Sequence, residues 1–286
     1  MITPYCTLSE AKTELKATSA VDDALLRQNI RRVSRRIDQL MNGRRQRPYF
    51  APWIEQREFE VSMRRIDSHR NILWLDEPLL AYTGVLLGAE DITSLVEAYP
   101  SLASPIQALR FTSVSRSWYE KLTNSNPVSY VKVTGTWGWH SDYDNAWASV
   151  DALVSDMETS DTTISVADVD EADLYGFTPR LSAGNLLKVG DEFLEALETD
   201  TTANTADVKR GVNGSTQATS TISSGEAVYT WQVDEAIKRA TMRQAALLYA
   251  RRGSFQVETV DPVGTISYPQ DLLSELRGIV QEFHYA

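Results

Sequence analysis

Residues 22–43 read DDALLRQNIRRVSRRIDQLMNG, and this stretch decides the first element of the fold. Its apolar side chains recur at spacings of three and four residues, which is the period of one helical face. Those side chains belong to Leu26, Ile30, Val33, Ile37 and Leu40. Asp22 precedes the pattern as an N-cap, and Asn42 and Gly43 end it. The sequence therefore predicts a long amphipathic helix.

The opposite face of this helix is basic. It carries Arg27, Arg31, Arg32, Arg35 and Arg36, and the residues that follow add Arg44, Arg45 and Arg47. Such a face could bind DNA phosphates or an acidic partner subunit. It could equally be a solvated face whose cations suit the C-terminal end of a helix. The pattern leaves both interpretations open.

Three further helices are expected. Residues 7–16 form a short amphipathic candidate with Thr7 or Ser9 as its cap, and residues 233–252 form a long, alanine-rich one capped by Asp234. A last helix is predicted from residue 270 to Phe283. Beyond it, Phe283, His284 and Tyr285 form an aromatic end that either packs against its own core or docks in a partner groove.

Short β-type runs lie between these helices. Residues 55–111 contain alternating or apolar runs separated by glycine and proline, which predicts a small sheet or half-barrel. Residues 130–133 form another strand that leads into a turn of glycine and tryptophan. The expected fold class is therefore α+β, with a helical core and a small β-sheet portion.

Residues 151–230 form a separate acidic segment. The chain has 286 residues and a formal net charge of -11, and this segment contains 15 acidic and 4 basic residues, so it accounts for the whole excess. Five strand candidates and the Asn213-Gly214 pair, a strong hairpin signal, predict a mainly-β module here. Trp147 and Trp231 flank it in a helical or near-helical context. We therefore expect a module inserted into a core of residues 1–150 and 231–286.

Composition bounds the class of protein. Hydrophobic content of 42% and charged content of 23% are typical of a folded globular chain. No apolar run reaches the roughly 20 residues of a membrane span, and the first residues lack a secretory pattern, so synthesis in a cytoplasm is expected. Cys6 is the only cysteine, which excludes an internal disulfide and a cysteine-based zinc site. The acidic balance argues against nucleic-acid binding over the whole surface.

Motifs for catalysis are missing from the sequence. There is no P-loop, dinucleotide fingerprint, nucleophile elbow or zinc-protease motif, and the histidines His69, His140 and His284 lie far apart. His140, Asp142 and Asp144 alternate and could hold a divalent cation, but a polar turn is the commoner use of such a pattern. We therefore expect no enzyme activity, no cofactor and no metal.

Neighbouring carboxylates offer one enzymatic alternative. Asp170 with Glu171, or Asp191 with Glu192, could act as acid and base in a glycosidase. Surface acid on a β module is far commoner, so a carbohydrate-active enzyme is the less favoured interpretation.

Three blocks together resemble the head-to-tail connector (adaptor) proteins of tailed bacteriophages. They are the arginine-rich helix of residues 22–41, the run ILWLDEPLL at residues 72–80 with the segment up to Pro105, and VTGTWGW at residues 133–139 followed by VDEAIKRA at residues 233–240. No block is specific alone, but their order is. The acidic module resembles a small β unit of phage tail and connector proteins, with serine at position 215 in place of the usual threonine.

This resemblance implies a structural protein of the virion neck. It implies a homo-oligomeric ring, with twelve copies expected, between the portal protein and a tail-side or stopper protein, and DNA passing through its lumen without sequence specificity. Arg31, Arg35, Arg36, Arg44 and Arg45 would face the channel or a neighbouring subunit. The C-terminal residues Phe283, His284 and Tyr285 would reach the portal. A tail or baseplate component is the alternative within virion proteins.

Overall fold

The computed structural model describes residues 3–42, 47–60, 66–67, 71–101, 104–112, 130–173, 176, 178–251, 259–260, 266–267 and 274–285. Contacts between residues divide the chain into two compact units. Unit 1 consists of Met1–Pro48, Trp147–Val212 and Thr216–Ala286, and unit 2 consists of Tyr49–Ala146 with Asn213–Ser215. The helices and the acidic module thus belong to one unit, whereas the sequence predicted a division at residues 150 and 231.

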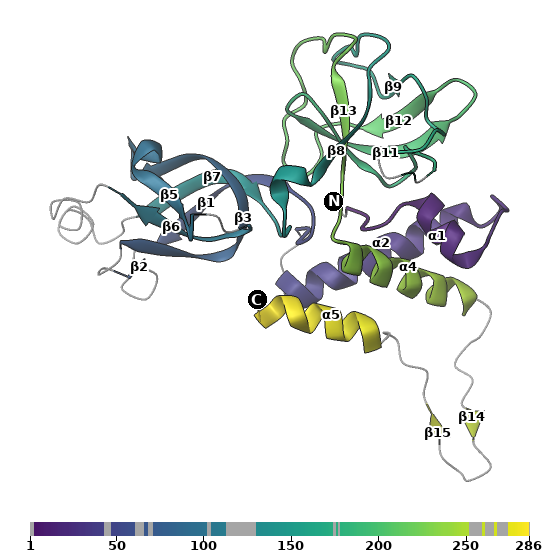
Figure 1. Ribbon diagram of the computed structural model, residues 1–286, viewed down its shortest axis with the longest axis horizontal. Coiled ribbons are helices and arrows are strands. Elements are labelled where there is room, and N and C mark those ends of the chain that lie inside the picture. The colour runs from purple at the N-terminus through teal and green to yellow at the C-terminus, as the bar shows by residue number, and fades with distance from the viewer. Residues whose placement is uncertain are drawn as a thin grey trace. The chain divides into compact units, whose positions relative to one another are not determined.

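Unit 1 contains a group of helices that pack on one another (Figure 1). They are α1 (Leu8–Leu15), α2 (Asp23–Asn42), α4 (Glu235–Ala250) and α5 (Ser274–Tyr285). Helix α4 contacts each of the other three. A short two-stranded ribbon, β14 (Thr259–Val260) with β15 (Ile266–Ser267), lies between α4 and α5 in the chain. None of the helices within the described ranges combines the length and apolar character that a membrane span requires.

The helix starts follow from local capping chemistry. The Thr7 hydroxyl accepts a hydrogen bond from the Glu10 N–H, and the Glu10 carboxylate accepts one from the Thr7 N–H, which forms a capping box. The Asp234 side chain caps α4 by accepting from the Ala236 N–H. These contacts confirm two of the predicted helix starts.

The acidic module of unit 1 is a six-stranded antiparallel sheet in the order β8-β13-β10-β11-β12-β9. Its strands are β8 (Trp147–Ala152), β9 (Thr163–Ser165), β10 (Leu186–Val189), β11 (Glu192–Asp200), β12 (Thr205–Lys209) and β13 (Ala227–Trp231). The strands bury an apolar cluster that includes Ile164, Leu187, Leu194, Val208 and Val228. The five predicted strands of this segment are therefore confirmed.

Unit 2 is built on a seven-stranded antiparallel sheet with β1-β7-β3-β6-β5 as its main path. The strands are β1 (Trp53–Glu60), β2 (Ile66–Asp67), β3 (Ile72–Leu87), β4 (Glu90–Asp91), β5 (Val96–Tyr99), β6 (Ile106–Phe111) and β7 (Tyr130–Trp137), with short 3-10 turns η1 (Thr93–Leu95) and η2 (Tyr143–Asn145). β2 and β4 pair with the ends of β3. The core includes Phe59, Leu73, Leu79, Val85 and Trp137.

The predicted fold class, α+β with a helical connector core, is wrong. The protein is mostly β: the seven-stranded and six-stranded sheets each carry a hydrophobic core, and the helices described are four. The sheet of unit 2 was underestimated because two predicted short runs are parts of one 16-residue strand, β3. A register shift between Trp74 and Leu79 lets β3 continue past Pro78.

Two local predictions are also corrected. Trp147 and Trp231 do not belong to helices; they face each other across β8 and β13, with ring centroids 5.2 Å apart. Asn213 and Gly214 do not close a strand hairpin, because β12 pairs only with β11 and β9 among the described strands. Both residues have positive φ, so the tight turn forms, but its backbone bonds to the start of β1 instead: Ile54 N–H donates to Asn213 O at 2.9 Å.

Candidate functional site: the arginine face of helix α2

Helix α2 is anchored along its apolar side. Leu26, Ile30, Val33 and Ile37 are buried there, and the helix contacts α4 and α5. Ser34 adds a polar anchor, since its hydroxyl donates to Ile30 O and accepts from the N–H of Tyr5. The hydroxyl of Tyr5 also donates to the carboxylate of Asp38. These contacts fix which side of the helix is turned outward.

The outward side carries three exposed arginines, Arg32, Arg35 and Arg36, which we call the arginine face. Their spacing of three and four residues places them on adjacent turns of one side of the helix. Within the described ranges, no hydrogen bond or ion pair holds these side chains. The arginine face therefore presents guanidinium groups to the surroundings.

Arg31, which was predicted as a channel or partner contact, has a partner within unit 1. Its Nη2 lies 2.5 Å from Oε1 of Glu195 on β11. Burial raises the pKa of the Glu195 carboxyl above its ordinary value, and the charge of Arg31 offsets part of that rise. Arg27 reaches the same strand and donates from Nη1 to Leu197 O at 3.2 Å. These two arginines attach the helix to its own module.

The other predicted contact residues are only partly described. Arg44 and Arg45 lie outside the described residues. Phe283 is half-buried in α5, and His284 and Tyr285 belong to the last turn of that helix. Helix α5 packs against α2.

The alternating His140, Asp142 and Asp144 form a polar turn. The ring Nδ1 of His140 accepts from the Asp142 N–H at 3.0 Å, and the Asp142 carboxylate accepts from Asn145 Nδ2 at 2.8 Å. Across the described part of the chain, no three or more His, Cys, Asp or Glu side chains are grouped as metal ligands. The cation interpretation of this pattern has no geometric support.

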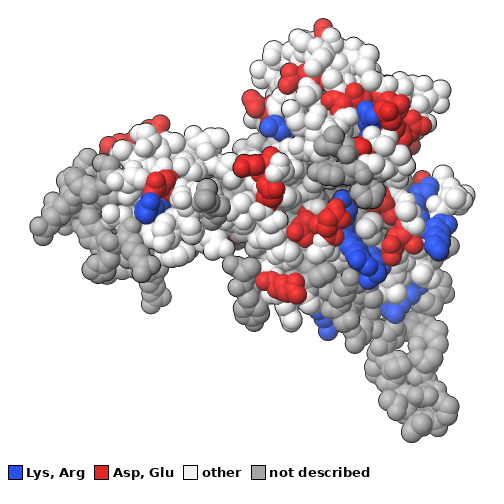
Figure 2. Space-filling view, in the orientation of Figure 1, with Lys and Arg blue, Asp and Glu red and all other residues white. Residues whose placement is uncertain are grey.

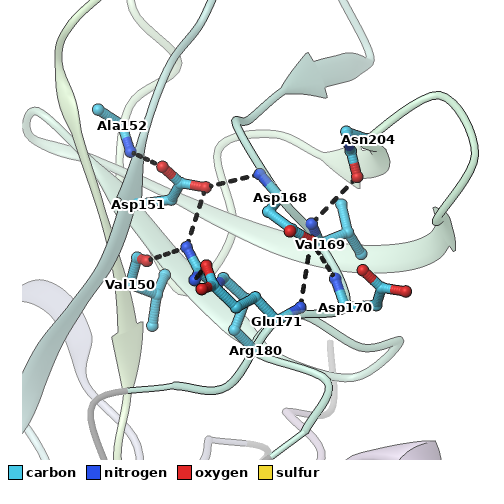
Figure 3. A network of polar contacts seen from close by, with 9 residues as sticks. All are labelled: Val150, Asp151, Ala152, Asp168, Val169, Asp170, Glu171, Arg180 and Asn204. Atoms are coloured by element: carbon cyan, nitrogen blue, oxygen red, sulfur yellow. Dashed lines mark hydrogen bonds and ion pairs between the residues drawn. The ribbon is translucent and has the colours of Figure 1, made fainter.

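The Asp170 and Glu171 pair belongs to a loop network around Arg180 (Figure 3). Asp168 accepts from the N–H groups of Asp170 and Glu171 at 3.0 and 3.1 Å. Hydrogen bonds to its carboxylate lower the pKa of Asp168, whereas the hydrogen bond with Asp168 and its charge raise the pKa of Asp170. Arg180 joins this loop to β8 through Glu171 and through Asp151, whose Oδ2 lies 3.3 Å from Nη1. The network holds a loop in place.

The second carboxylate pair is split by the strand geometry. Asp191 is exposed in the turn before β11, whereas Glu192 is buried and bonded to Arg210, with Nη2 2.7 Å and Nε 3.0 Å from its oxygens. Glu192 also accepts from the N–H groups of Gly211 and Ala218, at 3.0 and 2.9 Å. This ion pair was not predicted, because the sequence gives no local signal that joins residues 192 and 210.

Arg180 and Arg210 form ion pairs within the module, so two of its four basic side chains are not available to balance the acidic side chains on its surface. Acidic side chains gather on the visible face over β11 and β12 (Figure 2). Two of the exposed acids, Glu198 and Asp207, are directly opposite each other in the β11–β12 register, and we call this pair the acidic ladder. Like charges at directly opposed positions of a sheet repel.

The arginine face and the acidic ladder are thus surfaces of opposite charge on one unit. Surfaces of this kind favour association with a macromolecule of complementary charge. Comparison with protein-family models, with curated proteins and with solved structures finds no match for this chain.

Proposed function

We propose that this chain is a structural head-to-tail connector of a tailed bacteriophage. Copies would form a ring, of twelve by the resemblance, between the portal protein and a tail-side or stopper protein in the virion neck. DNA would pass through the ring without sequence-specific contacts. The order of the three sequence blocks described above supports this proposal.

The observation that carries the proposal is the arginine face. Arg35 and Arg36 are exposed on a helix whose other side is fixed by packing and by the Tyr5 contacts. Meanwhile the buried carboxylates Asp38, Glu192 and Glu195 each bind a partner that holds the fold. Charge available for recognition therefore lies on the surface, as an assembly subunit needs.

The expected mechanism is mechanical. A ring arises when two different surfaces of a subunit meet in a head-to-tail contact that closes on itself. Free energy would come from these interfaces, with a polar rim around each contact. Phosphates passing the lumen would interact electrostatically, so contact with DNA would weaken as salt is raised.

The proposal is tested by the mass of the purified chain. Light scattering measures that mass for the chain alone and with the portal protein of the same phage, and negative-stain imaging examines any large species. We expect rings or a portal-dependent assembly. A monomer that ignores the portal would contradict the proposal and favour a tail or baseplate component or, less readily, a carbohydrate-active enzyme.

Reversal of the arginine face should impair this assembly. We expect Arg35→Glu combined with Arg36→Glu to weaken ring formation by about tenfold or more, because like charges then meet at the contact. Arg239→Glu combined with Arg277→Glu is the matched control, since both residues are exposed arginines on other helices and the charge change is equal. Normal ring formation and completion of packaged heads by the first variant would count against the proposed role.

A further inference from the structure

We propose that the arginine face of one copy docks on the acidic ladder of a second copy of this chain. The inference deepens the proposed function and rests on it, because it names the contact that would join neighbouring subunits of the ring. Two different surfaces take part, so the contact is of the head-to-tail kind that closes into rings.

On the basic side of the contact, the arginine side chains repel one another. Arg32 and Arg36 are four residues apart and Arg35 lies between them, so like charges repel along the exposed side of α2. A guanidinium group can form two parallel hydrogen bonds with one carboxylate, and this bidentate contact is stronger than its hydrogen bonds with water. A pair of neighbouring carboxylates therefore suits this face.

On the acidic side of the contact, two carboxylates likewise repel each other. Glu198 and Asp207 are cross-strand partners and both are exposed. Asp207 also accepts a hydrogen bond from the Thr163 hydroxyl at 2.7 Å, but this neutral donor leaves its charge in place. Cations from a second copy would relieve the repulsion between the two carboxylates. Lys209, the nearest lysine on β12, is instead opposite Glu195. Leu197, at the β-bulge next to the ladder, is 39% exposed and could contact the second copy.

Contacts within the chain show that α2 and β11 fit each other chemically. Arg31 pairs with Glu195, and Arg27 donates to Leu197 O. Arg32, Arg35 and Arg36 repeat the same chemistry on positions that this internal contact does not use. A second copy would supply β11 and β12 carboxylates to them.

A second copy suits the arginine face better than DNA does. The face belongs to the unit that also contains residues 151–212 and 216–230, and these carry the entire net charge of -11. That acidic surface repels phosphates at close range. The same acid attracts the arginine face of another copy, so self-association uses both surfaces at once.

Two charge-reversed variants test the contact. The first carries Arg32→Glu and Arg36→Glu, and the second carries Glu198→Lys and Asp207→Lys. Asp200 is kept, because its carboxylate accepts from the N–H groups of Thr202 and Ala203 and holds a turn. Arg31 is kept because it binds Glu195. Sedimentation velocity measures assembly under the conditions in which the unaltered chain forms rings.

Each variant alone is expected to stay unassembled, because like charges then face each other at every contact. An equal mixture of the two is expected to assemble, since the reversed helix face of the first fits the reversed ladder of the second, and the unaltered surfaces also match. The rescue should restore assembly to within about tenfold of the unaltered chain. Thermal melting checks that both variants fold.

The matched control carries Asp191→Lys and Glu226→Lys. Both residues are exposed acids at the other end of the sheet, and the charge change equals that of the ladder variant. This control should assemble normally. If rings form but both face variants also assemble normally, or if the mixture fails to assemble, the docking contact is wrong while the connector function stands. If the unaltered chain never assembles, even with the portal, the connector function itself fails.

Binding of a short DNA duplex to each variant, measured in parallel, tests whether the arginine face binds DNA instead of a second copy. Loss of DNA binding by the first variant with ring formation unchanged would assign the arginine face to DNA and overturn the inference.

Discussion

At the scale of single residues, the buried Glu192–Arg210 pair explains how an acidic module keeps its loops in place. The two side chains are only 2% and 4% exposed. Burial by itself raises the pKa of Glu192, but the hydrogen bonds from Arg210, Ala218 and Gly211 and the Arg210 charge outweigh it and lower the pKa below its ordinary value. Arg210 also donates to Glu158 O at 2.5 Å, so one ion pair joins three segments of the chain.

The lowered pKa of Glu192 predicts a stability loss in acid. A carboxyl with a lower pKa in the folded state stabilises the fold above its unfolded pKa, and this contribution is lost as pH falls through the lower folded value. Glu192→Gln should lower the free energy of unfolding at neutral pH by about 3 kcal/mol, because it leaves Arg210 buried without its charge partner.

Urea unfolding between neutral pH and pH about 3 checks this prediction. The unaltered chain should lose more stability over that interval than Glu192→Gln does. Asp191→Asn, in the exposed neighbouring position, is the control and should follow the unaltered chain. Parallel pH profiles for Glu192→Gln and the unaltered chain would show that the pair does not contribute in this way.

At the scale of elements, the turn at residues 213–215 binds the start of β1, a strand far from it in the sequence, and not the strands that flank the turn. Within unit 2, Asn213 Nδ2 donates to Pro52 O at 3.0 Å, and Ile54 N–H donates to Asn213 O. Gly214 has φ of +78, and a Cβ atom there would lie 2.1 Å from Ile54 O. Glycine is needed at this position both for its backbone conformation and for the close approach of β1.

Gly214→Ala should therefore destabilise unit 2 by more than the backbone conformation alone explains. Gly88→Ala is the control, because Gly88 also has positive φ and a Cβ there would meet nothing within 4 Å. We expect the control to lose about 1 kcal/mol and Gly214→Ala to lose about 2–4 kcal/mol. The midpoints of urea unfolding measure the stability of the two variants. Equal losses would mean that the loop of residues 213–215 moves to accommodate the added Cβ atom without a loss of stability.

At the scale of the whole molecule, the acidic module extends beyond the predicted boundaries of 151 and 230. Trp147 and Trp231 are paired at the end of the sheet, and Phe193 lies 5.2 Å from the Trp147 ring. The helices of unit 1 also bind the module: Leu8 N–H donates to Ala183 O at 3.0 Å. Together with the Arg31–Glu195 ion pair, this contact makes the helices and the module a single packed body.

Two fragments test where the module ends. A fragment of residues 147–231 keeps β8 and β13 complete, whereas a fragment of residues 151–230 loses the tryptophan pair and most of β8. We expect the longer fragment to melt cooperatively and at least about 5 °C above the shorter one, because an aromatic pair and several ladder hydrogen bonds are restored. Equal melting temperatures would support the boundaries predicted from the sequence.

The sequence by itself determined the elements whose signals are local. The amphipathic period of residues 22–42, the caps Thr7 and Asp234, and five of the six strands of the acidic module were predicted correctly, whereas β8 was missed. Local signals suffice there because a cap or a period acts between residues a few positions apart. Of the candidate site, the sequence likewise identified the arginines of α2 as one face.

Only the tertiary structure decided what these elements pair with. It separated Arg31, bound to Glu195, from the exposed Arg35 and Arg36, and it placed Glu198 opposite Asp207. It also joined two predicted runs into β3, which is why the mostly-β fold class was missed. Strand register and buried ion pairs connect residues far apart in the chain, and they form only when sheets close around a shared core, so no short stretch of sequence contains them.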